Sequence, residues 1–351
     1  MSGAFLNTQA VETWDTWFRW RERGQLRDLT IESTWQRVAT CLTSQTPRGG
    51  RAEYQRRLLD AFGNWQLLPD RRVIATAGTP RHAWRPDDLV AVLNAVRFVR
   101  SPGLPRATLD TDRIEDVAAL AVYALDDAAA LVGSDDGQAQ LQVGVVGLGE
   151  ALAQLGVAYD SAEGRAYARL VAKKLCSGSL AGAVARARDR GARARCDEAW
   201  RQRAIARDLP LELIDAAQRY GLRCAQLTAI TSQPQLAALA NDVADAIDPA
   251  RDESCPSDAC TRRPDRRVAR AGLASRLAPD AAVPAQLQMR AAMQPWIDAP
   301  IAYPLLSAAD PDGAAARVWS ELARELKLAP LTWRTVLAEC DARLTLPHGM
   351  L

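Results

Sequence analysis

The chain has 351 residues, of which 48% are hydrophobic and 25% are charged, a composition typical of a globular protein with a substantial core. The formal net charge of +2 argues against binding to nucleic acid or a membrane surface through overall charge. No apolar run reaches the length of about 18 residues needed to span a bilayer, and no signal-peptide pattern opens the sequence. With seven dispersed cysteines, we expect reduced thiols in a cytoplasmic protein of one or two domains.

The N-terminal segment is rich in tryptophan. Trp14, Trp17 and Trp20 are spaced three residues apart, so on a helix they would form one aromatic ridge. We interpret this ridge as a short helix that packs the N-terminus onto the core. The alternative is a ridge that docks a partner.

Hydrophobic periodicity and capping residues predict most other elements. Two short apolar runs, 73–77 and 225–230, are the best candidates for strands. The predicted helices cover residues 29–43, 51–66, 86–100, 114–132, 143–156, 159–175, 208–222, 285–297, 311–326 and 331–344. The predicted fold class is therefore mainly α with a few short strands (α+β).

Three glycines, Gly144, Gly147 and Gly149, invite comparison with a dinucleotide-binding loop. That loop requires the spacing Gly-x-Gly-x-x-Gly directly after a strand. Here the spacing is Gly-x-x-Gly-x-Gly, and a buried helix is expected over 143–156. We interpret the glycines as positions of close helix packing and predict no dinucleotide site.

Residues 183–207 contain eight arginines, and Arg186, Arg190 and Arg193 would share one helical face. Such a face could contact phosphates, but acidic residues interrupt it and no aromatic residue precedes Trp200. We therefore expect a solvated helix surface, and a nucleic-acid-binding module is the less favoured alternative.

Several stretches resemble, in order, the large catalytic subunit of ribonucleotide reductases, most closely the adenosylcobalamin-dependent class. They are TWQRVA at 34–39, LLPDRRVIATAGT at 67–79, VGVVGLGEALAQLGVAYDSAEG at 143–164, YGLRCAQLTAI at 220–230 and ADAIDP at 244–249. The resemblance implies radical reduction of ribonucleotides for deoxyribonucleotide synthesis in a ten-stranded barrel. Because the interval between Thr79 and Ile114 is too short for most of that barrel, we expect a truncated, degenerate remnant of the fold.

The family carries its radical cysteine in an Asn-x-Cys-x-Glu motif that this sequence lacks. The nearest string, around Cys196, has no asparagine. The family's phosphate loop, Pro-Ser/Thr-x-Thr, corresponds by resemblance to a segment that includes Thr231, Ser232, Gln233 and Gln235. Pro234 removes a backbone donor there and glutamines replace small residues, so we expect phosphate binding to be largely lost.

Three cysteines are redox candidates. Cys255 and Cys260 resemble the mobile dithiol that re-reduces these enzymes, with two incidental loop cysteines as the alternative. Cys224 replaces the asparagine of the family's Gly-Leu-Arg-Asn segment. No catalytic residue and no metal site are assigned, since His82 and His348 are the only histidines. Adenosylcobalamin would be the cofactor if the resemblance extends to function.

The favoured function is a ribonucleotide-reductase-like accessory or binding protein without reductase activity of its own, whose partner is a full-length reductase or a nucleotide. The alternatives are a functional reductase or part of a split one, so the sequence leaves enzymatic activity open. The expected organisation is a Trp-rich segment at 1–30, a reductase-like helical core at 31–249, a loose linker at 250–285 and a C-terminal helical region at 286–351. Residues 285–344 are expected to cover the strand edges that a partial barrel exposes.

Overall fold

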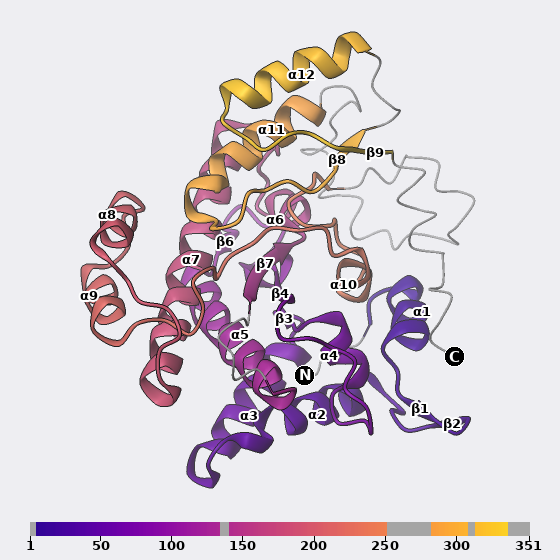
Figure 1. The fold of residues 1–351 in the computed structure, drawn as a ribbon. Helices are drawn as coiled ribbons and strands as arrows, with labels where there is room; N and C mark the ends of the chain where they lie inside the picture. The colour runs from indigo at the N-terminus through magenta and orange to yellow at the C-terminus, as the bar shows by residue number, and fades with distance from the viewer. Residues whose placement is uncertain (1–4, 134–139, 251–281, 308–312, 336–351) are drawn as a thin grey trace.

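A computed structural model describes residues 5–133, 140–250, 282–307 and 313–335 (Figure 1). Its helices are α1 (Thr8–Trp17), α2 (Ile31–Leu42), α3 (Arg48–Gly63), α4 (Arg71–Thr76), α5 (Thr111–Leu131), α6 (Leu148–Gln154), α7 (Ala162–Arg190), α8 (Glu198–Ala206), α9 (Leu211–Tyr220), α10 (Pro234–Leu239), α11 (Ala282–Met293) and α12 (Gly313–Glu325). The short 3₁₀ helices are η1 (Thr43–Gln45), η2 (Ala95–Phe98) and η4 (Gln294–Trp296). The strands are β1 (Arg21–Glu22), β2 (Gln25–Leu26), β3 (Leu67–Leu68), β4 (Leu89–Asn94), β5 (Val99–Arg100), β6 (Thr108–Leu109), β7 (Leu141–Val146), β8 (Leu305–Ser307) and β9 (Trp333–Thr335). The expected fold class, mainly α with short strands, is confirmed.

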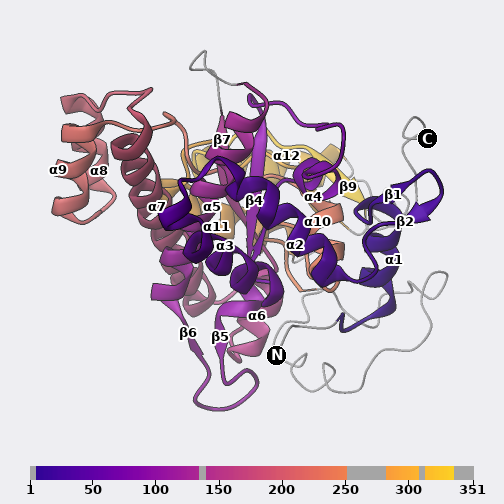
Figure 2. The same ribbon diagram turned by 90° about the horizontal axis from the view of Figure 1, so that it is seen from below.

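The central sheet has three strands in the order β3-β4-β7. β4 and β7 are parallel, with Leu89 opposite Leu141 and Asn94 opposite Val146, while the two-residue β3 pairs antiparallel at the edge of β4. The two parallel strands lie side by side in the middle of the molecule (Figure 2). α5 connects them, so β4, α5 and β7 form a βαβ unit.

A third extended segment continues the parallel sheet beside β7. Thr228 bridges to Val143 in parallel, and the Val143 N–H donates to the carbonyl of Leu227 at 2.9 Å. Gly144 permits this approach, because a Cβ at that position would lie 2.6 Å from the carbonyl oxygen of Ala229. Among the described residues the sheet stays open and does not close into a barrel.

The outer edge of this third segment is covered by the C-terminal part of the chain. The carboxylate of Asp298 accepts from the N–H groups of Leu227 (2.9 Å) and Thr228 (3.2 Å). The Ala299 N–H donates to the carbonyl of Thr228 at 3.1 Å. The expectation that the C-terminal region covers an exposed strand edge is confirmed at this position.

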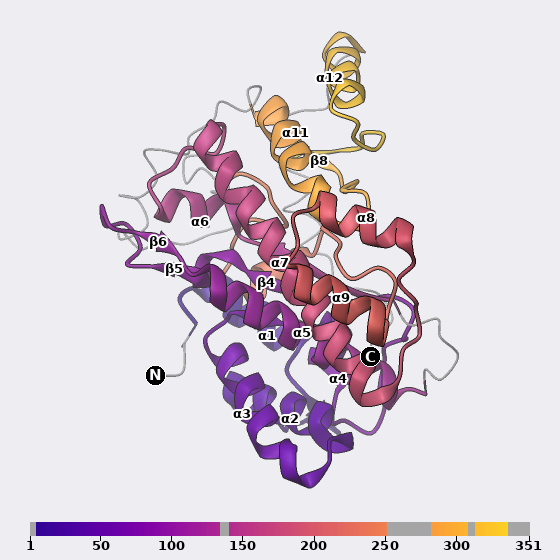
Figure 3. The same ribbon diagram turned by 90° about the vertical axis from the view of Figure 1, so that its left-hand side faces the viewer.

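α5 and α7 form the helical layer against the sheet and run side by side (Figure 3). Small residues such as Ala118 and Gly178 meet at their seam, so the backbones approach closely. The helices begin at side-chain caps, since Asp110 accepts from the third N–H of α5 at 3.3 Å and Ser161 from that of α7 at 2.9 Å. α9 ends at Gly221, whose φ of 73° suits glycine.

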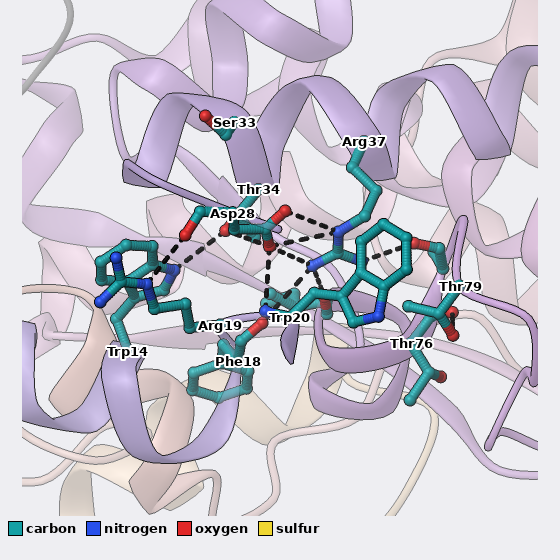
Figure 4. Close-up of polar contacts among 12 residues, drawn as sticks. Trp14, Phe18, Arg19, Trp20, Asp28, Ser33, Thr34, Arg37, Thr76 and Thr79 are labelled. Carbon is teal, nitrogen blue, oxygen red and sulfur yellow. Dashed lines mark hydrogen bonds and ion pairs between the residues drawn. The ribbon is translucent and has the colours of Figure 1, made fainter. Parts of the chain in front are cut away.

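The N-terminal segment is fastened to α2 and α4 by a buried polar network (Figure 4). The Trp14 indole donates to Thr34 Oγ1 at 2.9 Å, and Thr34 donates to Asp28 at 2.8 Å. Asp28 forms a buried ion pair with Arg37 at 2.7 Å, and Arg37 also donates to backbone carbonyls at the end of α4. α1 ends at Trp17, so Trp20 lies outside the helix and the three tryptophans do not form one ridge.

Several predicted elements are wrong. Of residues 73–77, expected as a strand, 73–76 belong to α4 and Ala77 is its C-cap. The helix expected at 86–100 is β4 followed by η2, and the one expected at 143–156 is β7 followed by α6. β4 and β7 are short apolar runs buried on both faces, and periodicity cannot distinguish such a strand from a buried helix. Of the helix expected at 331–344, residues 333–335 form β9 and residues 331–332 form neither helix nor strand, and residues 336–344 lie outside the described residues.

Within the described ranges, every helix is too short or too polar to cross a membrane.

Candidate functional site

The carboxyl ends of β4, β7 and the third extended segment meet at one edge of the parallel sheet. In open α/β sheets this edge is where ligands bind. Asn94 ends β4, Gly147 follows β7, and the loop Thr231–Gln233 follows the third segment before α10. The loop residues suggested by sequence therefore lie where a ligand site would be expected.

A carboxylate from the same chain occupies the donors of this loop. Asp245 accepts from the Ser232 hydroxyl at 2.5 Å and from the Gln233 backbone N–H at 2.7 Å. The Gln233 side-chain amide donates to Thr231 Oγ1 at 3.1 Å. Asp245 is 1% exposed, and Gln235 is the second residue of α10. The structure thus brings Thr231, Ser232 and Gln233 together around an internal anion.

The segment that carries Asp245 covers the strand ends, and we call residues 241–248 the strap. The Gly147 N–H donates to the carbonyl of Ala244, and the Ala244 N–H donates to Glu150 on α6, both at 2.9 Å. A Cβ at Gly149 would lie 2.1 Å from the backbone nitrogen of Ala250. The glycines do serve close packing. Gly144 lies within β7 against the third extended segment, and Gly147 and Gly149 follow β7 and pack against the strap region. A helix was expected where β7 lies.

The strap carries two buried carboxylates that share one arginine. Arg334 on β9 lies 3.3 Å from Asp245 and also forms an ion pair with Asp248. The Tyr303 hydroxyl donates to Asp248 at 3.0 Å. Burial, together with the negative charge of Asp248, raises the pKa of Tyr303 well above its usual value, so the phenol keeps its proton and remains a donor.

Residues 89–253 match the family model of the ribonucleotide reductase barrel domain. The matched segment is slightly less than half of the chain. It begins at the first residue of β4 and runs just past the strap. No curated protein matches the sequence. The open sheet and helical layer are consistent with a remnant of that barrel, and the interval from 79 to 114 contains β4, a strand of the parallel sheet.

Within this segment the helical face that carries Arg186 and Arg190 is turned into the protein, contrary to the sequence prediction, whereas Arg188, Arg195 and Arg203 are exposed. Arg186 lies on α7, is 5% exposed and pairs with Asp126 and Asp127 of α5. Arg190 pairs with the same two residues. Arg193 lies beyond the end of α7. The adjacent aspartates, in an otherwise apolar helix, were the available signal that basic partners would be buried.

The structure describes one of the three redox candidates. Cys224 is buried and its thiol donates to the carbonyl of Gln226 at 3.0 Å. Cys255 and Cys260 lie outside the described residues. Burial, with a contribution from Asp197, raises the pKa of Cys196 to about 11, and burial raises that of Cys176 to about 12. These two thiols are therefore protonated near neutral pH.

The described residues contain no group of three or more side chains arranged to hold a metal ion. A small gap between the sheet and the helical layer is lined by apolar side chains from Leu93, Ala95, Phe98, Ile114, Val145, Val171 and Leu175. It offers no polar group to orient a ligand.

Proposed function

We propose that this protein is a truncated, degenerate relative of the ribonucleotide reductase large subunit that has no reductase activity of its own and acts as an accessory or binding protein. The observation that carries this proposal is the pairing of Asp245 with Ser232 and Gln233. A substrate phosphate would need the same hydroxyl and N–H groups. It would have to displace a buried carboxylate that is already paired with Arg334, which also pairs with Asp248.

The thiols support the same proposal. Radical reduction requires a cysteine that faces the substrate, and the sequence has no Asn-x-Cys-x-Glu motif. The one redox candidate that the structure describes, Cys224, is buried, and its thiol donates to the carbonyl of Gln226 in its own chain. We therefore propose no step through adenosylcobalamin for this chain.

The proposed partner is another protein, such as a full-length reductase, rather than a nucleotide or nucleic acid. A nucleotide phosphate would find the donors of the loop, Ser232 and the Gln233 N–H, already bonded to Asp245. Nucleic acid is disfavoured as a partner because Arg186 and Arg190 form ion pairs with Asp126 and Asp127 inside the protein.

Two assays test the proposal. With ribonucleoside di- and triphosphates, adenosylcobalamin and a dithiol, we expect no deoxynucleotide, and product would contradict the proposal. By calorimetry, wild type should not bind inorganic phosphate, whereas Asp245→Ala should bind it saturably because the two donors are released. Asp208→Ala, which removes an exposed aspartate paired with Lys173, is the matched control and should behave as wild type. Phosphate binding by wild type would show that Asp245 does not block the loop.

A further inference from the structure

We infer that Arg334 is a latch that holds the strap over the carboxyl ends of the parallel strands, so that the β8–β9 unit controls access to this edge. The inference rests on the proposed function for the identity of the closed site. Its physical basis is separate and consists of the contacts that fasten the strap.

The strap has a conformation that depends on outside contacts. Val243 to Asp248 are buried although the segment forms neither helix nor strand. Three of its non-glycine residues, Asn241, Asp242 and Ala246, have φ values of 70°, 60° and 49°. Asn and Asp tolerate left-handed backbone, but at Ala246 it persists only where the surroundings impose it. A strap with this backbone should therefore change conformation when a fastening contact is removed.

The first fastenings come from the N-terminal region and the body of the protein. The Leu6 N–H donates to the side chain of Asn241 at 2.7 Å, and the Asn7 side chain donates to the Asn241 carbonyl at 2.9 Å. The Tyr159 hydroxyl donates to the carbonyl of Ile247 at 2.7 Å. These contacts are all neutral hydrogen bonds to one end or to the backbone of the strap.

The C-terminal fastening is ionic. Arg334, with its side chain 13% exposed, pairs with both buried carboxylates of the strap, Asp245 and Asp248. Removal of Arg334 takes a charged partner from each of these two buried carboxylates, and breaking a buried ion pair is strongly destabilising. Arg334 therefore contributes more than a neutral contact would.

The anchor of the latch can move without the main core. β9 pairs with β8, and this unit packs on a small cluster that contains Val283, Leu287, Leu305 and Ala323. The strap residues Val243, Ala246 and Ile247 belong instead to the large central core. Because small satellite units open at lower free energy than a central core, release of β9 is a local event.

Hydrogen exchange of the full chain, read by peptide mass spectrometry, tests the latch. In Arg334→Ala we expect exchange of the backbone amides in 233–248 to accelerate at least tenfold, with α5 and α7 unchanged and with Arg334→Lys between the two. Arg324→Ala is the control, because Arg324 lies exposed on α12 and pairs with Glu321. Unchanged strap exchange, or equal acceleration in α5 and α7, would overturn the inference.

A second variant covers the case in which Arg334→Ala does not fold. The double variant Arg334→Met, Asp248→Asn removes one positive and one negative charge together. It leaves Asp245 in place, so the bonds from Ser232 and Gln233 to Asp245 are kept. The same strap-specific acceleration is expected. If neither variant folds, the latch is overturned, since a contact on a satellite unit is then essential to the core. Both readouts are independent of phosphate binding and reductase activity, so failure of the latch is distinguishable from failure of the proposed function.

Discussion

Arg186 on α7 and Asp127 on α5 form an ion pair inside the protein, where their side chains are 6% and 0% exposed. Asp127 also accepts from the Tyr54 hydroxyl of α3 at 2.7 Å. The neighbouring Asp126 accepts from Arg223 at 2.9 Å, just before the third extended segment of the sheet. One buried cluster therefore joins three helices to the segment that leads into the candidate site.

Replacing Arg186 should strongly destabilise the fold. Arg186→Met leaves buried carboxylates short of a partner, and removal of one member of a buried ion pair costs about 3–5 kcal/mol. Urea unfolding measures this loss. Arg203→Met on the exposed surface of α8 is the control and should change the unfolding free energy by less than about 0.5 kcal/mol. Equal effects of the two changes would mean that the cluster does not stabilise the core.

Replacing Asp298 should uncover a strand edge. Asp298→Ala removes the acceptor of the Leu227 and Thr228 N–H groups, and each unsatisfied buried donor costs about 1–3 kcal/mol. The uncovered edge is also a template for pairing between chains. We expect a lower unfolding midpoint and concentration-dependent association in light scattering. Asp215→Ala, at an exposed ion pair with Arg201, should leave the protein monodisperse to the same degree as wild type.

Cys196 should react slowly with alkylating agents. With a pKa of about 11, about one thiol in a thousand is ionised at pH 8, roughly a hundredfold fewer than for an ordinary thiol. Iodoacetamide labelling, read on the Cys196 peptide, should become about tenfold faster per pH unit up to pH 11. Asp197→Ser retains a helix-capping hydroxyl but removes the charge, so the midpoint should fall. A midpoint near that of a free thiol in wild type would contradict the structure.

The same pKa shift links Cys196 to stability. Because its folded-state pKa is raised, the stabilisation is fully present below the unfolded-state pKa near 9 and is lost as the pH rises toward 11. The stability of Cys196→Ser should therefore depend less on pH than that of wild type between these values.

Local sequence signals predicted the elements that local physics decides. The apolar periodicity of residues 114–132 predicted α5, and Gly221 marked the end of α9, because capping and backbone preference act within a few residues. β4 and β7 were predicted as helices because a short, continuous apolar run carries no periodicity. Each becomes a strand because it pairs with the other, from Leu89–Leu141 to Asn94–Val146, after the crossover helix brings the two together.

The candidate site divides in the same way. The sequence located the loop through its resemblance to the reductase and identified Pro234 as a missing donor. It did not pair Ser232 with Asp245, and it interpreted Arg186 as a surface residue. No local pattern relates Arg334 to the strap, because the two lie more than 80 residues apart in the sequence. They come together in space only because α11 and β8 place β9 beside the sheet edge.

The sequence by itself therefore determined the helical class, the position of the loop and the absence of the radical-cysteine motif, since these depend on residue type and short-range order. Only the tertiary structure decided that the strand ends are closed, that Arg186 and Arg190 face inward and that the C-terminal unit reaches the strap. These outcomes depend on which charges are removed from water together, and buried charges are tolerated only where the fold brings their partners within bonding distance.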